Sequence, residues 1–385
     1  MSAVAVSSVD LSSVIRPGDG LVWGQACAEP QTLVEALVAQ RGALSGCSVF
    51  LGSSYSGIVR PEHADHLRLT SYCGTGTNRA LAQAGVLQLL PSPYSQLGAL
   101  IRSGQIKCDV AMVQVSPPNS RGEYSLGLAV EYLAPAIEAA RAVIAEVNER
   151  IPWIYTEPRL RREDIDLLVA SSRPPVYLEY GKPSEIDLRI ARHAADLVPD
   201  NATVECGIGA LPNAILSALA GREIQYHSGV VCDAVRLVKP ETCVGGAIMG
   251  TQALFDWARE NPALKLVSSD ITHGGTTLAK IKRFVAINSA VEVDLTGQVN
   301  GEIARESYVG AVGGALDFVR AANQSAAGVS IIALPASRVV ERLSGPVSVP
   351  RSEAGVFVTE HGMADLRGCT LAERERRMKR ISGSS

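Results

Sequence analysis

A glycine turn in the second half of the chain has residue types that could stabilise developing negative charge. In VECGIGALPNAILSAL (204–219), Gly207, Ile208, Gly209 and Ala210 lie between a β-like run and a helical pattern. Glycine lets the backbone turn sharply and lets a ligand oxygen approach the amides, and a helix start offers N–H groups without helical partners. The turn therefore predicts an oxyanion site; the alternative is a tight strand-helix connection that binds nothing.

A second glycine turn has the same potential. In YVGAVGGALDFVRAA (308–322), Gly313 and Gly314 precede a helical pattern that begins near Ala315 and Leu316. The amides around these residues are candidates for binding an anion. Asp317 fits a structural role at the positive end of this helix.

Carboxylates and histidines supply candidates for proton transfer. Glu292 and Asp294 alternate with apolar residues, so both face one side of a strand, where they either share a proton or line a solvated face. Glu360 and His361 end an apolar run beside a glycine, which could bring an acid and an imidazole close to a pocket. The eight cysteines form no C-x-x-C pair and no zinc-like Cys/His cluster, so buried thiols and no metal are expected.

Strand and helix patterns alternate around these residues, which predicts an α/β fold with largely parallel sheets covered by helices. The β-like runs are 20–26, 47–52, 66–72, 108–115, 142–147, 202–209, 291–297, 329–335 and 355–362, and the helical patterns are 30–44, 132–142, 184–198, 212–221 and 251–261.

The length of 385 residues indicates two domains. Polar, proline-bearing segments at 149–166 and 171–187 interrupt the periodicity and are expected to connect the domains over the surface. We therefore expect one domain in residues 1–185 and a similar one in 186–385.

Composition limits the classes of partner. The net charge of -3 gives no field strong enough for a nucleic-acid groove or an anionic membrane surface. No apolar run is long enough to span a membrane, and the first residues lack the basic region of a secretory signal. A cytoplasmic protein that acts on a small molecule is expected.

Several segments, in the same order, closely resemble the acetyl-CoA hydrolase/transferase family and, within it, the 4-hydroxybutyrate CoA-transferase type. The segments are RPGDGLVWGQACAEPQTLVEAL, DVAMVQVSPPNSRGEYSLG, CGIGALPNAIL, FVAINSAVEVDLTGQVNGE, GGALDFVRAA, SIIALPA and VTEHGMADLRG. The resemblance implies two CoA-transferase α/β domains with the active site between them, acyl-CoA as the source of coenzyme A, a carboxylate acceptor in transfer, and a homo-oligomer. It also implies that the amides of both glycine turns form the oxyanion hole.

In this family a glutamate attacks the acyl-CoA, becomes an acyl anhydride and then a glutamyl-CoA thioester. The resemblance places this glutamate in a motif reading His-Ser/Thr-Glu, about one helix after the first glycine turn. This chain has HSGVVCD (227–233) there, so Gly229 stands at the position of the nucleophile. Glycine can form neither anhydride nor thioester.

Three functions remain open. The first is hydrolysis of an acyl-CoA thioester, or of a C–C bond beside a carbonyl, with a retained oxyanion hole; the candidate bases are His227, Cys232, His273, Glu360 and His361. Of these, His273 and His361 stand at positions where the sequence departs from the family. The second function is ordinary CoA transfer with another carboxylate, such as Glu205 or Glu360, and the third is non-catalytic binding of acyl-CoA.

Overall fold

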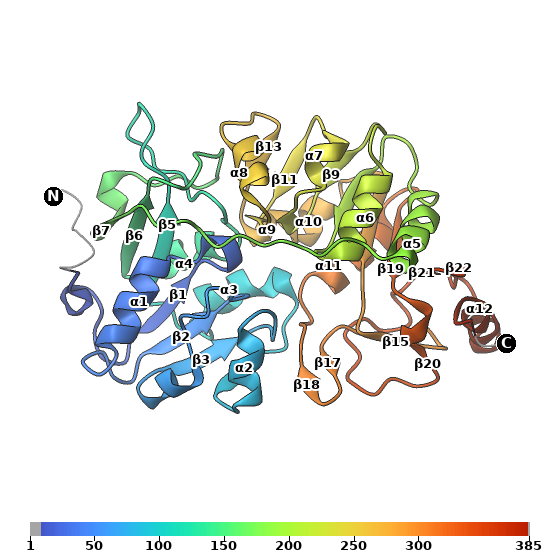
Figure 1. The fold of residues 1–385 in the computed structure, drawn as a ribbon, viewed down its shortest axis with the longest axis horizontal. Coiled ribbons are helices and arrows are strands. Elements are labelled where there is room, and N and C mark those ends of the chain that lie inside the picture. The colour runs from blue at the N-terminus through green and yellow to red at the C-terminus, as the bar shows by residue number, and fades with distance from the viewer. Residues whose placement is uncertain (1–8, 384–385) are drawn as a thin grey trace. The chain divides into compact units, whose positions relative to one another are not determined.

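The computed structural model describes residues 9–383 and divides into two compact units (Figure 1). The first unit contains residues 9–92, 96–178 and 246–270, and the second contains 93–95, 179–245 and 271–383. The sequence placed one division near residue 185. In the structure the chain crosses to the second unit between 178 and 179, and the excursions at 93–95 and 246–270 were not expected.

The first unit is built around a parallel sheet with the strand order β4-β3-β2-β1-β5-β6-β7. Its strands are β1 (Gly20–Trp23), β2 (Ser48–Leu51), β3 (Arg68–Ser71), β4 (Leu87–Leu89), β5 (Val110–Val115), β6 (Ala142–Asn148) and β7 (Leu167–Ser171). The unit also holds α1 (Gln31–Gln40), α2 (Asn78–Gln83), α3 (Leu97–Arg102), α4 (Leu133–Ala139), α8 (Gln252–Ala258), β12 (Ala247–Ile248) and β13 (Leu264–Leu266). Within residues 9–383, short 3-10 helices lie at Leu11–Ser13, Ala26–Ala28, Pro61–Asp65, Tyr94–Gln96, Arg162–Asp164 and Ala336–Arg338.

Burial explains why the central strands read as continuous apolar runs. Every residue of β1 and β5 is buried, as expected for parallel strands that helices cover on both faces. Leu21, Val49, Met112 and Ile144 belong to one apolar cluster of this unit. The predicted α/β architecture with largely parallel sheets is confirmed.

The segment expected to connect the domains contains a strand. The short run Leu167–Ser171 pairs with β6 as β7, an edge strand of the first sheet. Its few apolar residues lie between polar, proline-bearing stretches, so its own periodicity gave too weak a signal. Pairing with a neighbouring strand, which local sequence does not report, decides its conformation.

The main sheet of the second unit runs in the order β11-β9-β8-β14-β19-β21-β22, with parallel pairs up to β21 and an antiparallel last pair. Its strands are β8 (Thr203–Cys206), β9 (Gln225–His227), β11 (Cys243–Gly245), β14 (Phe284–Asn288), β19 (Val329–Ala333), β21 (Val356–Thr359) and β22 (Gly362–Asp365). Smaller strands are β10 (Val230–Val231), β15 (Glu292–Asp294), β16 (Val299–Asn300), β17 (Ile303–Ala304), β18 (Ser307–Tyr308) and β20 (Val339–Val340). The helices are α5 (Glu185–Ala195), α6 (Ala210–Ala218), α7 (Val235–Val238), α10 (Gly275–Leu278), α11 (Ala315–Gln324) and α12 (Leu371–Ile381). The chain passes from the first unit to the second within α9 (Ser269–Thr272).

The strand order of the second sheet predicts where a ligand would bind. From β8 the chain continues through α6 to β9 on one side, whereas β14 pairs with β8 on the other side. In open α/β sheets, ligands bind outside the carboxyl ends of the strands at such a point of reversal. The first glycine turn follows directly from the carboxyl end of β8.

Residues 9–383 contain no helix that is both long and apolar enough to cross a membrane.

Candidate functional site

The first glycine turn leaves backbone amides open toward the point of reversal. Gly209 has a φ of +127°, which favours glycine, and it directly precedes α6. The Gly207 amide donates to the Ile287 carbonyl at 3.1 Å, so it belongs to the sheet. Within residues 9–383 the amides of Ile208, Gly209 and Ala210 have no hydrogen-bond acceptor in the structure, which leaves them able to bind an anion.

The second glycine turn is tied to the short segment 93–95. Gly313, at a φ of +57°, accepts a hydrogen bond from the Tyr94 amide at 3.0 Å. The Asp317 carboxylate, in the first turn of α11, accepts from the Ser95 amide at 3.1 Å and from the Ser95 hydroxyl at 2.7 Å. Asp317 therefore has the structural role that its position suggested, although its partner is distant in sequence.

The HSGVVCD segment continues from the end of β9 and is fixed on both sides of Gly229. Ser228 donates from its amide to Val244 O at 3.1 Å and from its hydroxyl to Cys206 O at 3.1 Å. On the other side, the Tyr226 hydroxyl donates to Val230 O at 2.9 Å. The backbone at Gly229 is therefore held close to the end of β8.

The imidazole of His273 fills the space beside Gly229. A Cβ placed on Gly229 would lie 2.8 Å from Cε1 and 2.9 Å from Nε2 of His273. A Cβ on Gly314 would lie 2.5 Å from the same Nε2. The ring thus lies against one glycine of the HSGVVCD segment and one glycine of the second turn, and both glycines are required for that packing.

Two aromatic rings and a threonine hold the imidazole. The ring centroids of Tyr94 and Phe318 each lie 4.6 Å from that of His273. Thr272 Oγ1 lies 2.9 Å from Nδ1, within hydrogen-bond distance. Burial, reinforced by His227, lowers the pKa of His273 to about 3, so the ring is neutral at physiological pH.

His227 is also buried, and its ring is hydrogen-bonded to the backbone next to His273. Its Nε2 is 3.0 Å from the Thr272 carbonyl oxygen and donates to it, because a carbonyl can only accept. Burial lowers the pKa of His227, and this hydrogen bond opposes the effect in part. A neutral His227 with its proton on Nε2 therefore supports the residue that holds His273.

Glu205 is a buried carboxyl group on the same sheet. Val204 of β8 pairs with Tyr226 of β9, so the next residues along, Glu205 and His227, point to the same face. The Asn288 amide donates to Glu205 Oε2 at 2.8 Å. Burial nevertheless raises the pKa of Glu205 to about 8, which keeps it largely protonated at neutral pH.

The other candidate side chains lie elsewhere or are chemically unsuited. Burial raises the pKa of Cys232 to about 12, so its thiol is neither a nucleophile nor a base at neutral pH. Glu360 and His361 follow β21, which is four strands from β9, or about 19 Å at ~4.8 Å per strand. Glu360 accepts from the Ala336 amide at 2.8 Å, and His361 is exposed. The structure does not bring either of them to Gly229.

The carboxylates of Glu292 and Asp294 also have structural partners. Glu292 accepts from Ser344, Gly345 and Asn300, at 2.6 to 3.1 Å. Asp294 accepts from the Thr296 and Gln298 segment at 2.7 to 3.0 Å. They shape the turns around β15 rather than form a proton-sharing pair.

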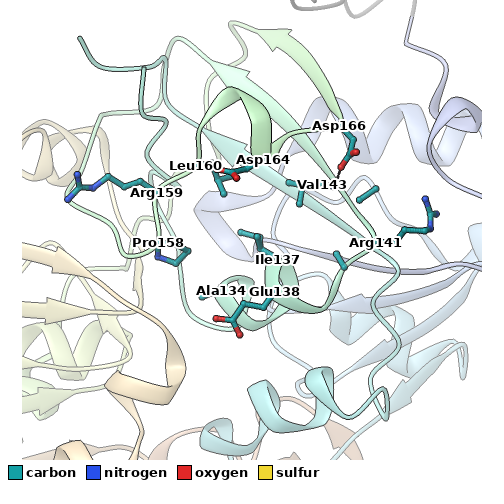
Figure 2. Close-up of a pocket in the computed structure, with 12 residues that line it drawn as sticks. Ala134, Ile137, Glu138, Arg141, Val143, Pro158, Arg159, Leu160, Asp164 and Asp166 are labelled. Atoms are coloured by element: carbon teal, nitrogen blue, oxygen red, sulfur yellow. Dashed lines mark hydrogen bonds between the residues drawn. The ribbon is translucent and has the colours of Figure 1, made fainter. Parts of the chain in front are cut away.

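A cavity of about 400 Å³ in the first unit is separate from these residues (Figure 2). It lies at the amino ends of β6 and β7, and Glu138, Arg141, Arg159, Asp164 and Asp166 contribute charged groups to its lining. None of the candidate residues named above lines it. Within residues 9–383, no group of three or more His, Cys, Asp or Glu side chains is arranged to hold a metal ion.

The sequence pointed to Gly229 and to His273 separately, but it did not indicate that the His273 ring packs against Gly229 or which residues hold that ring. Tyr94 is distant from both in the chain and carries no motif, so no local signal pointed to it. Phe318 lies at helical spacing from Ala315, where an aromatic residue reads as core. Asn288, at the carboxyl end of a strand, was the one missed residue whose position could have indicated a role.

Two family domains cover most of the chain. Residues 5–176 match the acetyl-CoA hydrolase/transferase N-terminal domain, and residues 250–385 match the C-terminal domain of the same family.

Relatives of known name match along nearly their whole length. The 4-hydroxybutyrate coenzyme A transferase of Clostridium kluyveri is 32% identical, with 96% of this chain and 92% of the relative aligned. The butyryl-CoA:acetate CoA-transferase of Anaerostipes caccae is 28% identical, with 94% and 89% aligned. The crystal structure of RipA from Yersinia pestis superposes with a TM-score of 0.92 at 28% identity, covering 97% of this chain and 92% of RipA.

Proposed function

This chain belongs to the acetyl-CoA hydrolase/transferase family of acyl-CoA-processing enzymes, and from that premise we propose that it hydrolyses an acyl-CoA without a glutamyl-enzyme intermediate. The bond that breaks is the thioester or a C–C bond beside a carbonyl. The relatives named above are mostly CoA-transferases, so the proposal concerns how this member differs from them.

The observation that carries the proposal is the packing of His273 against Gly229. If Gly229 stands at the position of the family's nucleophile, as the HSGVVCD motif suggests, the chain has no carboxylate there. The space in which such a side chain would start is occupied by a buried imidazole. A covalent glutamyl-CoA therefore has neither a side chain nor room at this position.

The open backbone amides of the site suit the addition of water to a thioester. The oxygen of water forms a bond to the carbonyl carbon, and the carbonyl electron pair moves to oxygen, where the open amides of the first glycine turn stabilise the negative charge. The pair then returns, the C–S bond breaks, and the thiolate takes up the proton that water released. The products are the free carboxylic acid and coenzyme A.

Other carboxylates are poor substitutes for the missing nucleophile. Glu205 is held mainly protonated by burial, and a protonated carboxyl is a weak nucleophile. Glu360 lies about 19 Å from the end of β9 across the sheet, by the spacing of strands. These positions favour hydrolysis over transfer through a relocated glutamate.

The test is to incubate the purified protein with acetyl-, butyryl-, 4-hydroxybutyryl-, succinyl- and β-ketoacyl-CoA, with and without acetate or succinate. Free thiol and the masses of all products are followed. Thiol release without an acceptor supports thioester hydrolysis, and a shortened acyl-CoA supports C–C cleavage. Exchange that requires an acceptor, together with an enzyme-CoA adduct trapped by hydroxylamine, would overturn the proposal in favour of transfer.

A control variant tests whether the measured activity comes from this site. Gly209 has a φ of +127°, where a side chain is strained, so Gly209→Ala should distort the first glycine turn and lower turnover. If the wild-type protein binds each acyl-CoA and turns over none of them, it is a binding protein, and the proposed hydrolysis is wrong.

A further inference from the structure

One nitrogen of the His273 ring has no protein partner. His273 is 5% exposed, and its Nδ1 lies against Thr272 Oγ1. Within residues 9–383 the structure contains no hydrogen-bond partner for Nε2.

The unpartnered nitrogen faces the two backbone segments of the candidate site. Nε2 lies 2.9 Å from the Cβ position of Gly229 and 2.5 Å from that of Gly314. Both residues have only backbone to offer, so the ring lies directly against the main chain of the HSGVVCD segment and of the second glycine turn. Tyr94 and Phe318 pack on the ring and restrict its rotation away from this direction.

We propose that His273 is a substrate-binding catalytic residue that donates a hydrogen bond from Nε2 to the carbonyl oxygen of the acyl-CoA. The proposal rests on the proposed function. It names His273 as the group that, together with the backbone amides, stabilises the oxyanion when no carboxylate acts as nucleophile. The same hydrogen bond strengthens as this oxygen becomes an oxyanion, so it stabilises the transition state more than the substrate.

The electrostatics of the ring favour a donor over a base. With a pKa of about 3 the imidazole is neutral at physiological pH and is a weak acceptor of protons. If Thr272 Oγ1 donates to Nδ1, the proton of the neutral ring resides on Nε2 and points toward the glycines. A neutral imidazole can polarise a carbonyl in this way without ever becoming charged.

A binding experiment tests the contact on the intact wild-type protein, independently of turnover. The ring nitrogens of ¹⁵N-histidine-labelled protein are followed by NMR while S-(2-oxopropyl)-CoA is added; this thioether keeps a carbonyl and cannot be hydrolysed. His273→Gln identifies the His273 signals. The expected result is a protonated Nε2 whose proton moves downfield on binding. If the analogue binds and leaves the His273 nitrogens unchanged, the inference is wrong.

A kinetic experiment tests the role in catalysis. His273→Phe keeps a ring between Tyr94 and Phe318 but removes both nitrogens, whereas His273→Gln keeps an amide donor. For His273→Phe we expect kcat to fall about 100- to 1,000-fold with little change in KM, as for loss of one oxyanion donor, and partial recovery for His273→Gln. The wild-type rate should show no protonation step of His273 between pH 5 and 8, as a neutral donor requires.

The two proposals fail in different ways. Acceptor-dependent transfer through a trapped adduct would overturn the hydrolytic function, and the NMR contact would still decide whether Nε2 binds the carbonyl. Hydrolysis that His273→Phe leaves within about threefold of wild type would overturn the inference alone, since a lost oxyanion donor costs far more.

Discussion

The Cε1 atom of His273 lies 2.8 Å from the point where a Cβ on Gly229 would be. Real Cβ atoms do not approach other heavy atoms so closely, so either the imidazole or a side chain at residue 229 can occupy this space. The two residues are therefore coupled: a change at one has consequences that depend on the other.

The first prediction concerns the stability of Gly229→Ala. The added methyl group has to displace a buried ring, so unfolding should cost about 1 to 3 kcal/mol less than in the wild-type protein. Gly207→Ala is the matched control, because a Cβ on Gly207 meets no atom within 4 Å. Urea denaturation of both variants checks the prediction, and equal midpoints for the two would contradict it.

The second prediction concerns a glutamate at residue 229, the proposed position of the family's nucleophile. Gly229→Glu alone should form little or no glutamyl-CoA, because His273 occupies the space that the new side chain needs. Gly229→Glu combined with His273→Ala removes the obstruction and should form more adduct. Mass spectrometry after hydroxylamine or borohydride trapping measures both, with His273→Ala alone as the control. Equal adduct in the single and double variants would show that the imidazole does not block the position.

The third prediction concerns the pH dependence of stability due to Glu205. Its pKa is raised from 4.5 to about 8 in the folded protein, so the folded state holds a proton that the unfolded state has lost. Stability should therefore fall as pH rises from about 4.5 to 8, with a slope of up to about 1.4 kcal/mol per pH unit. Glu205→Gln should be more stable relative to the wild-type protein at pH 8 than at pH 5.

The measurement is the difference between the two proteins, since Glu131 in the first unit also has a pKa of about 8 and adds the same trend to both. Glu360→Gln, at a half-buried carboxyl, serves as the control. Parallel curves for the wild-type and Glu205→Gln proteins would show that Glu205 does not retain its proton on folding.

The fourth prediction concerns the pH dependence of stability due to His273, which is opposite in sign to that due to Glu205. The pKa of His273 falls from 6.5 to about 3 on folding, so below pH 6.5 the unfolded chain binds a proton that the folded protein excludes. Stability should decline as pH falls from about 6.5 toward 3. His273→Gln should lose less stability than the wild-type protein over this range, whereas His361→Gln, at an exposed histidine, should follow the wild-type curve. Denaturation midpoints at pH 4.5 and 7 provide the comparison.

The sequence by itself determined the features that are local. The continuous apolar runs that form β1 and β5 predicted buried parallel strands, since strands that helices cover on both faces are apolar on both faces. The turn before α6 was recognisable from its glycines, since the φ of +127° at Gly209 favours glycine. The proposal that Gly229 stands where the family has its glutamate likewise rests on one short motif.

Only the tertiary structure decided which candidates meet. Strand order separates Glu360 from Gly229 across the sheet, although the sequence offered Glu360 as a candidate base or substitute carboxylate for that site. His273 and Tyr94 come together through contacts between segments far apart in the chain. Local periodicity and turn chemistry report the conformation of a few neighbouring residues. Packing, burial and the resulting pKa values depend on the side chains that the fold brings together, which is why the imidazole beside Gly229 could be found only in three dimensions.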